Sequence, residues 1–200
     1  QITFCEPTLE SRETTMKNVL EQTNAIFIPP YNHFNIISGQ GTAAKELIED
    51  TGNLDIVMAP VGGGGLISGT ATAVKGMSPE TKVIAVEPVN ADDAFRSFHA
   101  GRIIPSVNPD TIADGLLTSL GTLTFAIIMK KLDDIITVSE SSIIYAMRMI
   151  WERMKIIVEP SAAVPLAALV EGKIDFSGKR IGIILSGGNA DLNKLPFTQV

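Results

Sequence analysis

Four consecutive glycines at positions 62–65 follow the apolar run 56–61 and lead into the small, apolar stretch 66–71. This order predicts a buried strand, a loop without side chains and the first turn of a helix. Backbone N–H groups at a helix N-terminus lie at the positive end of the helix dipole, which suits a bound phosphate. The alternative is a flexible connector, although linkers are seldom flanked tightly by a buried strand and a helix. The expected phosphate ligands are the amides of Gly62, Gly63, Gly64, Gly65 and Leu66.

The residues around the glycines narrow the kind of phosphate. A Walker A loop requires Gly-Lys-Ser/Thr, but Leu66 follows the last glycine. A dinucleotide fingerprint fails because Ile67 and Ser68 stand where its third glycine would fall. The stretch 39–44 formally fits G-x-G-x-x-A, but two prolines and a polar segment separate it from the nearest strand-like run, so we interpret it as a helix start. A simple phosphomonoester therefore fits better than a pyrophosphate.

Two further loops carry polar groups directly after apolar runs. Ser186 follows the run 181–185 and precedes two glycines, so its hydroxyl can reach a ligand ring; an ordinary strand-to-helix turn explains it equally well. Segment 87–93 supplies carboxylates and a backbone carbonyl across one turn, which are ligands for Mg²⁺ or Ca²⁺. The alternative is that Asp92 or Asp93 only caps the next helix.

These loops need strands and helices to position them, and short β-rich runs alternate with helical patterns along the chain. Strands are expected at 2–5, 25–28, 55–60, 82–87, 134–138 and 180–185, and helices at 11–22, 42–50, 67–76, 93–99, 124–132, 140–154 and 161–171. Several strands are apolar on both faces, as in a parallel sheet covered by helices on both sides. We therefore expect an α/β fold with a parallel twisted sheet flanked by helices and ligands at the carboxyl ends of its strands.

The clearest helix is 140–154, where apolar residues recur on one face of a 3.6-residue period. Ser139 is its expected N-cap, and Pro160 can open the next helix. The stripe consists of Ile143, Ala146, Met147, Ile150, Trp151 and Met154. We expect these side chains to belong to the core rather than to a cofactor site.

Composition limits the partners and the compartment. A hydrophobic content of 45% allows a large core, whereas a net charge of −6 argues against nucleic acid and anionic membranes. No apolar stretch approaches the ~18 residues of a membrane span. The single cysteine, Cys5, excludes an internal disulfide and suits the reducing cytoplasm; we expect it to be buried and structural.

Taken in order, the three loops resemble those of the fold type II pyridoxal-phosphate enzymes (tryptophan synthase β-like), in particular the serine racemases and serine/threonine dehydratases, or ammonia-lyases. Residues 60–66 resemble their phosphate loop, 87–93 the divalent-cation segment of the racemases, and 186–189 the segment whose serine bonds the pyridine nitrogen. Stretches 38–42, 111–115, 151–155 and 159–161 are similar as well. The resemblance implies pyridoxal 5'-phosphate held by the glycine loop, Gly115 and Ser186, and Mg²⁺ or Ca²⁺ held by Glu87, the Ala91 carbonyl and Asp93.

The resemblance also implies a domain division. Residues 1–24 would end a small domain, and 25–200 would form most of the large cofactor-binding domain. The lysine that forms the Schiff base, and the loop for the substrate carboxylate, would precede Gln1, so none of the ten lysines is assigned a catalytic role and the chain alone is expected to be inactive. A homodimer, and a nucleotide effector near Lys155 and Asn189, are further implications.

The activity implied by the resemblance is removal of the α-proton from a hydroxy amino acid. Loss of the β-hydroxyl then yields a 2-oxo acid and ammonia, whereas reprotonation on the opposite face yields the enantiomer. The serine at the pyridine nitrogen leaves that nitrogen largely neutral, which favours elimination. Serine, threonine and 3-hydroxyaspartate remain open as substrates. The alternative function is a non-catalytic module that binds phosphate or cofactor and lacks the lysine.

Overall fold

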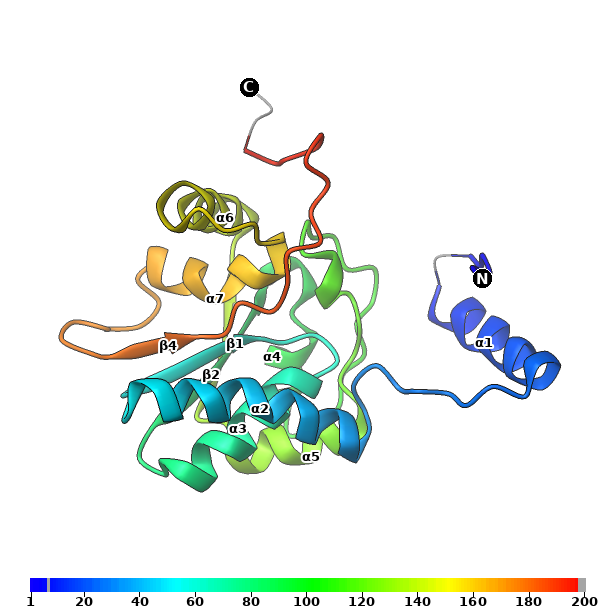
Figure 1. Cartoon of the computed structure of the whole chain (residues 1–200), viewed down its shortest axis with the longest axis horizontal. Coiled ribbons are helices and arrows are strands. Elements are labelled where there is room, and N and C mark those ends of the chain that lie inside the picture. Colours follow the sequence, from blue (N-terminus) through cyan, green and yellow to red (C-terminus); the bar gives the residue numbers. More distant parts are fainter. Residues whose placement is uncertain (7, 198–200) are drawn as a thin grey trace.

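The computed structural model describes residues 1–6 and 8–197, and four parallel strands form one sheet in the order β3-β2-β1-β4 (Figure 1). The strands are β1 (Ile56–Pro60), β2 (Lys82–Pro88), β3 (Asp134–Val138) and β4 (Ile181–Ile183). The predictions at 55–60, 82–87, 134–138 and 180–185 are therefore confirmed, with differences of at most two residues at an end. The expected α/β fold with a parallel sheet is confirmed as well.

Seven α-helices and two short 3₁₀ turns accompany the sheet in the described part of the chain. They are α1 (Leu9–Thr23), α2 (Phe34–Thr51), α3 (Gly65–Met77), η1 (Val89–Ala91), α4 (Asp93–Ala100), η2 (Asp114–Leu116), α5 (Thr122–Lys131), α6 (Glu140–Met154) and α7 (Pro160–Val170). Within the described residues, no helix combines the length and apolar character needed to span a bilayer.

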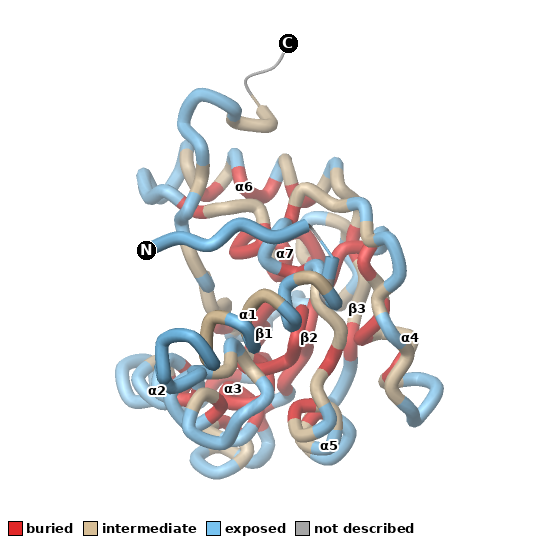
Figure 2. Tube along the Cα trace, turned by 90° about the vertical axis from the view of Figure 1, so that its right-hand side faces the viewer, coloured by how far each residue is buried: buried red, intermediate tan, exposed pale blue. Residues whose placement is uncertain are grey.

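Helices cover both faces of the sheet, and the strand residues divide between two cores. Ile56 and Met58 of β1 pack in one core with α6 and α7, whereas Val57 and Ala59 pack in the other with α2, α3 and α5. Successive side chains of a strand point to opposite faces, so a strand that is apolar throughout needs a layer on each side. Figures 1 and 2 show these layers and the buried strands between them.

Helix α6 follows the predicted period, with Ile143, Ala146, Met147 and Ile150 buried and Trp151 packed against the core. The expectation that Met154 also belongs to the core is wrong, because its side chain lies at the exposed end of the helix and is 58% exposed. Ser139 is its N-cap, because its hydroxyl accepts a hydrogen bond from the Ser142 N–H. Pro160 stands in the first turn of α7, as expected. For the bounds of α6 and the starts of α6 and α7, the local sequence alone was sufficient.

The interpretation of 39–44 as a helix start is wrong, because α2 begins earlier, at Phe34. The glycines instead bring α2 and α3 close together. A Cβ on Gly41 would lie 3.0 Å from the Gly69 carbonyl oxygen, and a Cβ on Gly69 would overlap the backbone of α2. Such contacts form only in the folded protein, so the sequence alone could not predict that these glycines allow α2 and α3 to pack closely.

The strand predictions at 2–5 and 25–28 are also wrong. Both segments lack regular secondary structure, and Phe4 and Ile26 are each 91% exposed. A β-rich run becomes a strand only when another strand pairs with it, and none does so within the described residues. Cys5 is exposed rather than buried. Figure 1 shows α1 standing apart from the sheet; the division at residue 24 stays a prediction.

Candidate functional site

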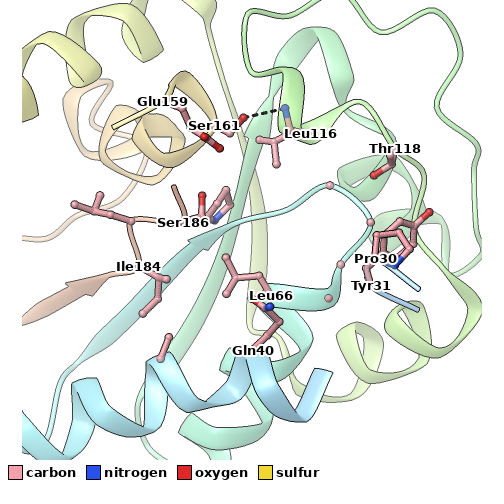
Figure 3. A pocket seen from close by; sticks show the side chains of 18 of the residues that line it. Pro30, Tyr31, Gln40, Leu66, Leu116, Thr118, Glu159, Ser161, Ile184 and Ser186 are labelled. Carbon is pink, nitrogen blue, oxygen red and sulfur yellow. Dashed lines mark hydrogen bonds between the residues drawn. The ribbon is translucent and has the colours of Figure 1, made fainter. Parts of the chain in front are cut away.

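A cavity of about 460 Å³ lies at the carboxyl ends of β1 and β4, which are neighbours in the sheet. The predicted cofactor residues Gly62, Gly63, Gly64, Gly65, Leu66, Gly115 and Ser186 all line it. These residues come from three loops that are far apart in the sequence. In Figure 3, Ser186 and Glu159 lie on one side of the cavity, and Pro30 and Tyr31 lie on the other.

The glycine loop presents unpaired backbone donors to this cavity. Within the described residues, none of the N–H groups from position 62 to 66 donates a hydrogen bond, whereas the preceding Val61 N–H bonds the Val86 carbonyl at 3.0 Å. The loop is held instead through a carbonyl, since the Thr124 hydroxyl donates to Gly63 O at 2.8 Å. The loop leads directly into α3, so its donors stand at the positive end of that helix. An anion can bind there through backbone groups alone.

Close packing explains why this loop carries no side chains. A Cβ on Gly63 would overlap the ring of Tyr31, and a Cβ on Gly62 would lie 3.0 Å from Leu116 Cα. Gly64 has a φ of 89°, where other residues are strained, and its Cβ would lie 2.8 Å from Thr124 Cβ. The packing of the chain around the loop therefore requires glycine at these positions.

Gly115 and Ser186 meet at the start of α7. The Gly115 N–H donates to the Ser161 hydroxyl at 3.1 Å, drawn as the dashed line in Figure 3. The Ser186 loop is tied by the Glu159 N–H, which donates to Gly187 O at 3.1 Å. Ser186 itself is exposed, with no hydrogen bond to its hydroxyl among the described residues. Its oxygen is therefore free to contact a ligand.

The lining residues that the sequence reasoning did not name as site residues include Arg12, Tyr31, Glu159 and Ser161. The stretch 159–161 was noted only as a resemblance. Arg12 is the one lysine or arginine among the cavity-lining residues that the structure describes, so it contributes the positive side chain there. Burial raises the pKa of the Tyr31 phenol, which keeps it neutral over the glycine loop. No local pattern marks Arg12 or Tyr31, whereas the family-like stretch 159–161 was a signal for the other two.

No lysine is among the described residues that line the cavity. The resemblance places the Schiff-base lysine in a Ser-x-Lys motif before Gln1 and implies that this motif is absent from positions 1–200. Contrary to that expectation, Ser177-Gly178-Lys179 has the spacing of the motif. However, Lys179 lines a different cavity, together with Asp55 and Lys82 at the amino ends of β1 and β2. Lys179 therefore lies at the amino ends of the strands and cannot act in the cavity at their carboxyl ends.

The predicted metal residues lie at and just after the carboxyl end of β2, outside the cavity that the glycine loop lines. Glu87 and Asp93 are each 1% exposed, and Ala91 is buried beside them. The Glu87 carboxylate accepts the N–H of Ala94 at 3.3 Å and that of Phe95, so it caps α4. Asp92 occupies the N-cap position without capping, and pairs with Arg96 at 2.7 Å. The alternative that Asp92 or Asp93 caps this helix is therefore wrong, and the carboxylate that does so is Glu87.

Both buried carboxyls resist ionisation. Burial raises the pKa of Glu87 to about 9, with the neighbouring Asp93 adding to the shift. Burial raises the pKa of Asp93 to about 6, against the opposing charge of Arg96. The Asp93 Oδ2 atom has no hydrogen-bond partner. The described residues contain no group of three His, Cys, Asp or Glu that could hold a metal, so any site here also needs the backbone carbonyl.

Comparison with known proteins agrees with this geometry. The family model described as pyridoxal-phosphate dependent enzyme matches residues 1–187. The β-hydroxyaspartate dehydratase of Paracoccus denitrificans (strain Pd 1222) is 50% identical over 196 residues, covering 98% of this chain and 62% of the relative. The Dictyostelium discoideum serine racemase structure has a TM-score of 0.87 at 49% identity, covering 96% of this chain and 62% of that one.

A third similar protein is the T.th. threonine deaminase, whose structure has a TM-score of 0.84 at 44% identity. The match covers 89% of this chain and 65% of that one. The chain thus spans somewhat under two thirds of the length of these relatives. The family match extends over nearly all of the chain, including the glycine loop and Ser186. The chain belongs to the family of pyridoxal-phosphate dependent enzymes.

Proposed function

We propose that the protein containing this chain is a pyridoxal-phosphate-dependent serine/threonine ammonia-lyase, serine racemase, or both. It would remove the α-proton of a hydroxy amino acid and expel the β-hydroxyl to give a 2-oxo acid and ammonia. The observation that carries this proposal is the row of unpaired N–H groups at positions 62–66, facing Ser186 across one cavity. Relatives that are named as a dehydratase, a racemase and a deaminase support the reaction class.

Different residues of the cavity would bind different parts of the cofactor. The backbone amides of the glycine loop would hold the phosphate, and Ser186 would face the pyridine nitrogen. Because Ser186 is a neutral hydroxyl, it leaves that nitrogen less charged than a carboxylate would. When bound, pyridoxal phosphate supplies the electron sink that makes the α-proton removable. The guanidinium of Arg12 adds a positive charge to the same cavity and favours an anionic substrate group.

A divalent cation is part of the proposal. Mg²⁺ or Ca²⁺ would bind Glu87, the Ala91 carbonyl and Asp93, with waters completing the oxygen shell. The residues fit such an ion, because Asp93 Oδ2 is buried without a partner and no hydrogen bond to the Ala91 carbonyl is found among the described residues. A cation would relieve the burial of both charged carboxylates. Its role is structural, since these residues do not line the cofactor cavity.

We further infer a homodimer and a nucleotide effector contacting Lys155 and Asn189. Both residues are exposed, and Lys155 ends α6 in the left-handed conformation with a φ of 61°. Size-exclusion chromatography with light scattering of the full-length protein tests the dimer. ATP titration of the parent and of Lys155→Ala tests the effector, which is rejected if the two proteins respond alike.

The activity is tested on the full-length protein with pyridoxal phosphate and Mg²⁺. L-serine, L-threonine and L-threo-3-hydroxyaspartate are supplied separately, and the 2-oxo acids, ammonia and D-serine are measured. We expect ammonia and a matching 2-oxo acid from at least one substrate. Tight cofactor binding without turnover of any of the three would instead support the non-catalytic module.

A further inference from the structure

Glu159 occupies an unusual position at the start of α7. It is the N-cap residue, yet its side chain makes no capping hydrogen bond to its own helix. The carboxylate instead reaches the loop after β4, where Oε2 accepts the Asn189 N–H at 2.9 Å. The backbone N–H of the same residue donates to Gly187 O at 3.1 Å. A single residue therefore holds the Ser186 loop at two points.

The carboxylate also shapes what its neighbours can be. A Cβ on Gly187 would lie 2.9 Å from Glu159 Oε2, and its three nearest atoms would all belong to that carboxylate. A Cβ on Gly115 would lie 3.7 Å from Glu159 Oε1. The carboxylate therefore restricts position 187 to glycine, whereas its distance from position 115 is an ordinary contact. This arrangement brings the carboxylate, the Gly115 loop and the Ser186 loop into one contact.

Ser186 lies between two fixed points. On its N-terminal side, the Ile184 N–H bonds Met58 O in β1 at 2.9 Å. On its C-terminal side, the first ties are those that Glu159 makes to Gly187 and Asn189. Ser186 has no hydrogen bond of its own to hold its hydroxyl in place among the described residues. The direction of that hydroxyl therefore depends on the ties on either side.

We propose that Glu159 is a positioning residue that fixes Ser186, and that it acts through the hydrogen bond that its carboxylate accepts from the Asn189 N–H. Glu159 has no ion pair in the described part of the chain, so its carboxylate is not engaged by another side-chain charge. The proposal rests on the proposed function only in assigning Ser186 to the pyridine nitrogen. The tie itself is a property of the polypeptide.

The test compares variants of the full-length protein without cofactor, using hydrogen exchange of the 187–189 amides, of which the Asn189 N–H is the one that Glu159 binds. Glu159→Ala removes the acceptor, and we expect exchange there to rise at least tenfold. Glu159→Gln keeps an acceptor oxygen at the same reach, so its exchange should stay within threefold of the parent. Glu152→Ala is the matched control, because Glu152 is an exposed carboxylate on α6 paired with Arg148. It should leave these amides unchanged.

A second pair of variants keeps the proposal testable if Glu159→Ala is poorly folded. Gly187→Ala should raise the dissociation constant for pyridoxal phosphate about tenfold, since its Cβ strikes the carboxylate. With Glu159→Gly already present, the same change should cost less than threefold, because the obstructing atoms are gone. Unchanged exchange in Glu159→Ala, equal damage by Glu159→Gln, or an additive double variant would each overturn the proposal. Absence of turnover in the parent would reject the proposed function and leave the exchange result standing.

Discussion

The carboxyl ends of the neighbouring strands β1 and β2 carry groups suited to ligands of opposite charge. After β1, the glycine loop offers backbone N–H groups and excludes side chains by contact with Tyr31, Leu116 and Thr124. At the carboxyl end of β2, the carboxylates of Glu87, within the strand, and Asp93, just after it, are buried and their pKa values are raised. The first site is ready for an anion at any pH, because amides do not titrate. The second site becomes favourably charged only when a cation joins it.

The largest expected effect is the complete loss of activity in residues 1–200, which contain both sites. A polypeptide of residues 1–200, supplied with pyridoxal phosphate and serine or threonine, should produce no pyruvate, 2-oxobutanoate or D-serine above free cofactor. The reason is that no lysine among the described residues lines the cavity. Turnover would mean that one of the ten lysines reaches the cofactor and that the assignment is wrong.

The backbone site should be sensitive to added volume. In the full-length protein, Gly64→Val should weaken cofactor binding at least tenfold, or about 1.4 kcal/mol. The new side chain would meet Thr124, at a φ that valine adopts only with strain. Gly39→Ala is the control, since a Cβ there meets nothing within 4 Å. An equilibrium titration followed by cofactor fluorescence measures both, and equal affinities would reject the phosphate assignment.

The carboxylate site should respond to metal. Mg²⁺ or Ca²⁺ at about one hundred times its dissociation constant should stabilise the full-length protein by about 2.7 kcal/mol. Asp93→Asn should abolish this gain, whereas Asp92→Asn should keep it because Asp92 pairs with Arg96 instead. Thermal unfolding with metal and with chelator provides the measurement. If chelator leaves the parent unchanged, Glu87 serves only as the cap of α4.

The last prediction concerns the pH dependence of the protein after a chelator has removed any metal. The pKa of Glu87 is raised from an ordinary 4.5 to about 9, and that of Asp93 from 3.8 to about 6. A raised pKa gives stability that is fully present below the ordinary value and lost as pH rises through the folded value. The free energy of unfolding should therefore decline between pH 5 and pH 9. Urea unfolding should show a flatter decline in Glu87→Gln; an identical slope would contradict the assignment.

Local patterns predicted the elements that depend on neighbours in the sequence. The helical period of α6 predicted both of its ends correctly, and the runs that are apolar on both faces predicted the four paired strands. Segments whose state depends on distant partners were predicted wrongly: residues 2–5 have β-rich sequence but no partner strand among those described. Similarly, the glycines at 39–41 suggested a boundary, but Gly41 lies inside α2 against Gly69.

The sequence by itself determined the candidate binding residues that can be recognised by residue type and position. These are the consecutive glycines after a strand, a serine at a strand end, and two acidic residues on either side of one turn. Only the tertiary structure decided which of them share a cavity and which other residues join them. Arg12 and Glu159 entered because α1 and the start of α7, far apart in the sequence, each bring one side chain to the lining of that cavity. Likewise, the capping of α4 by Glu87 follows from burial. Spacing along a chain reports local geometry, whereas burial and convergence arise only when distant segments pack together.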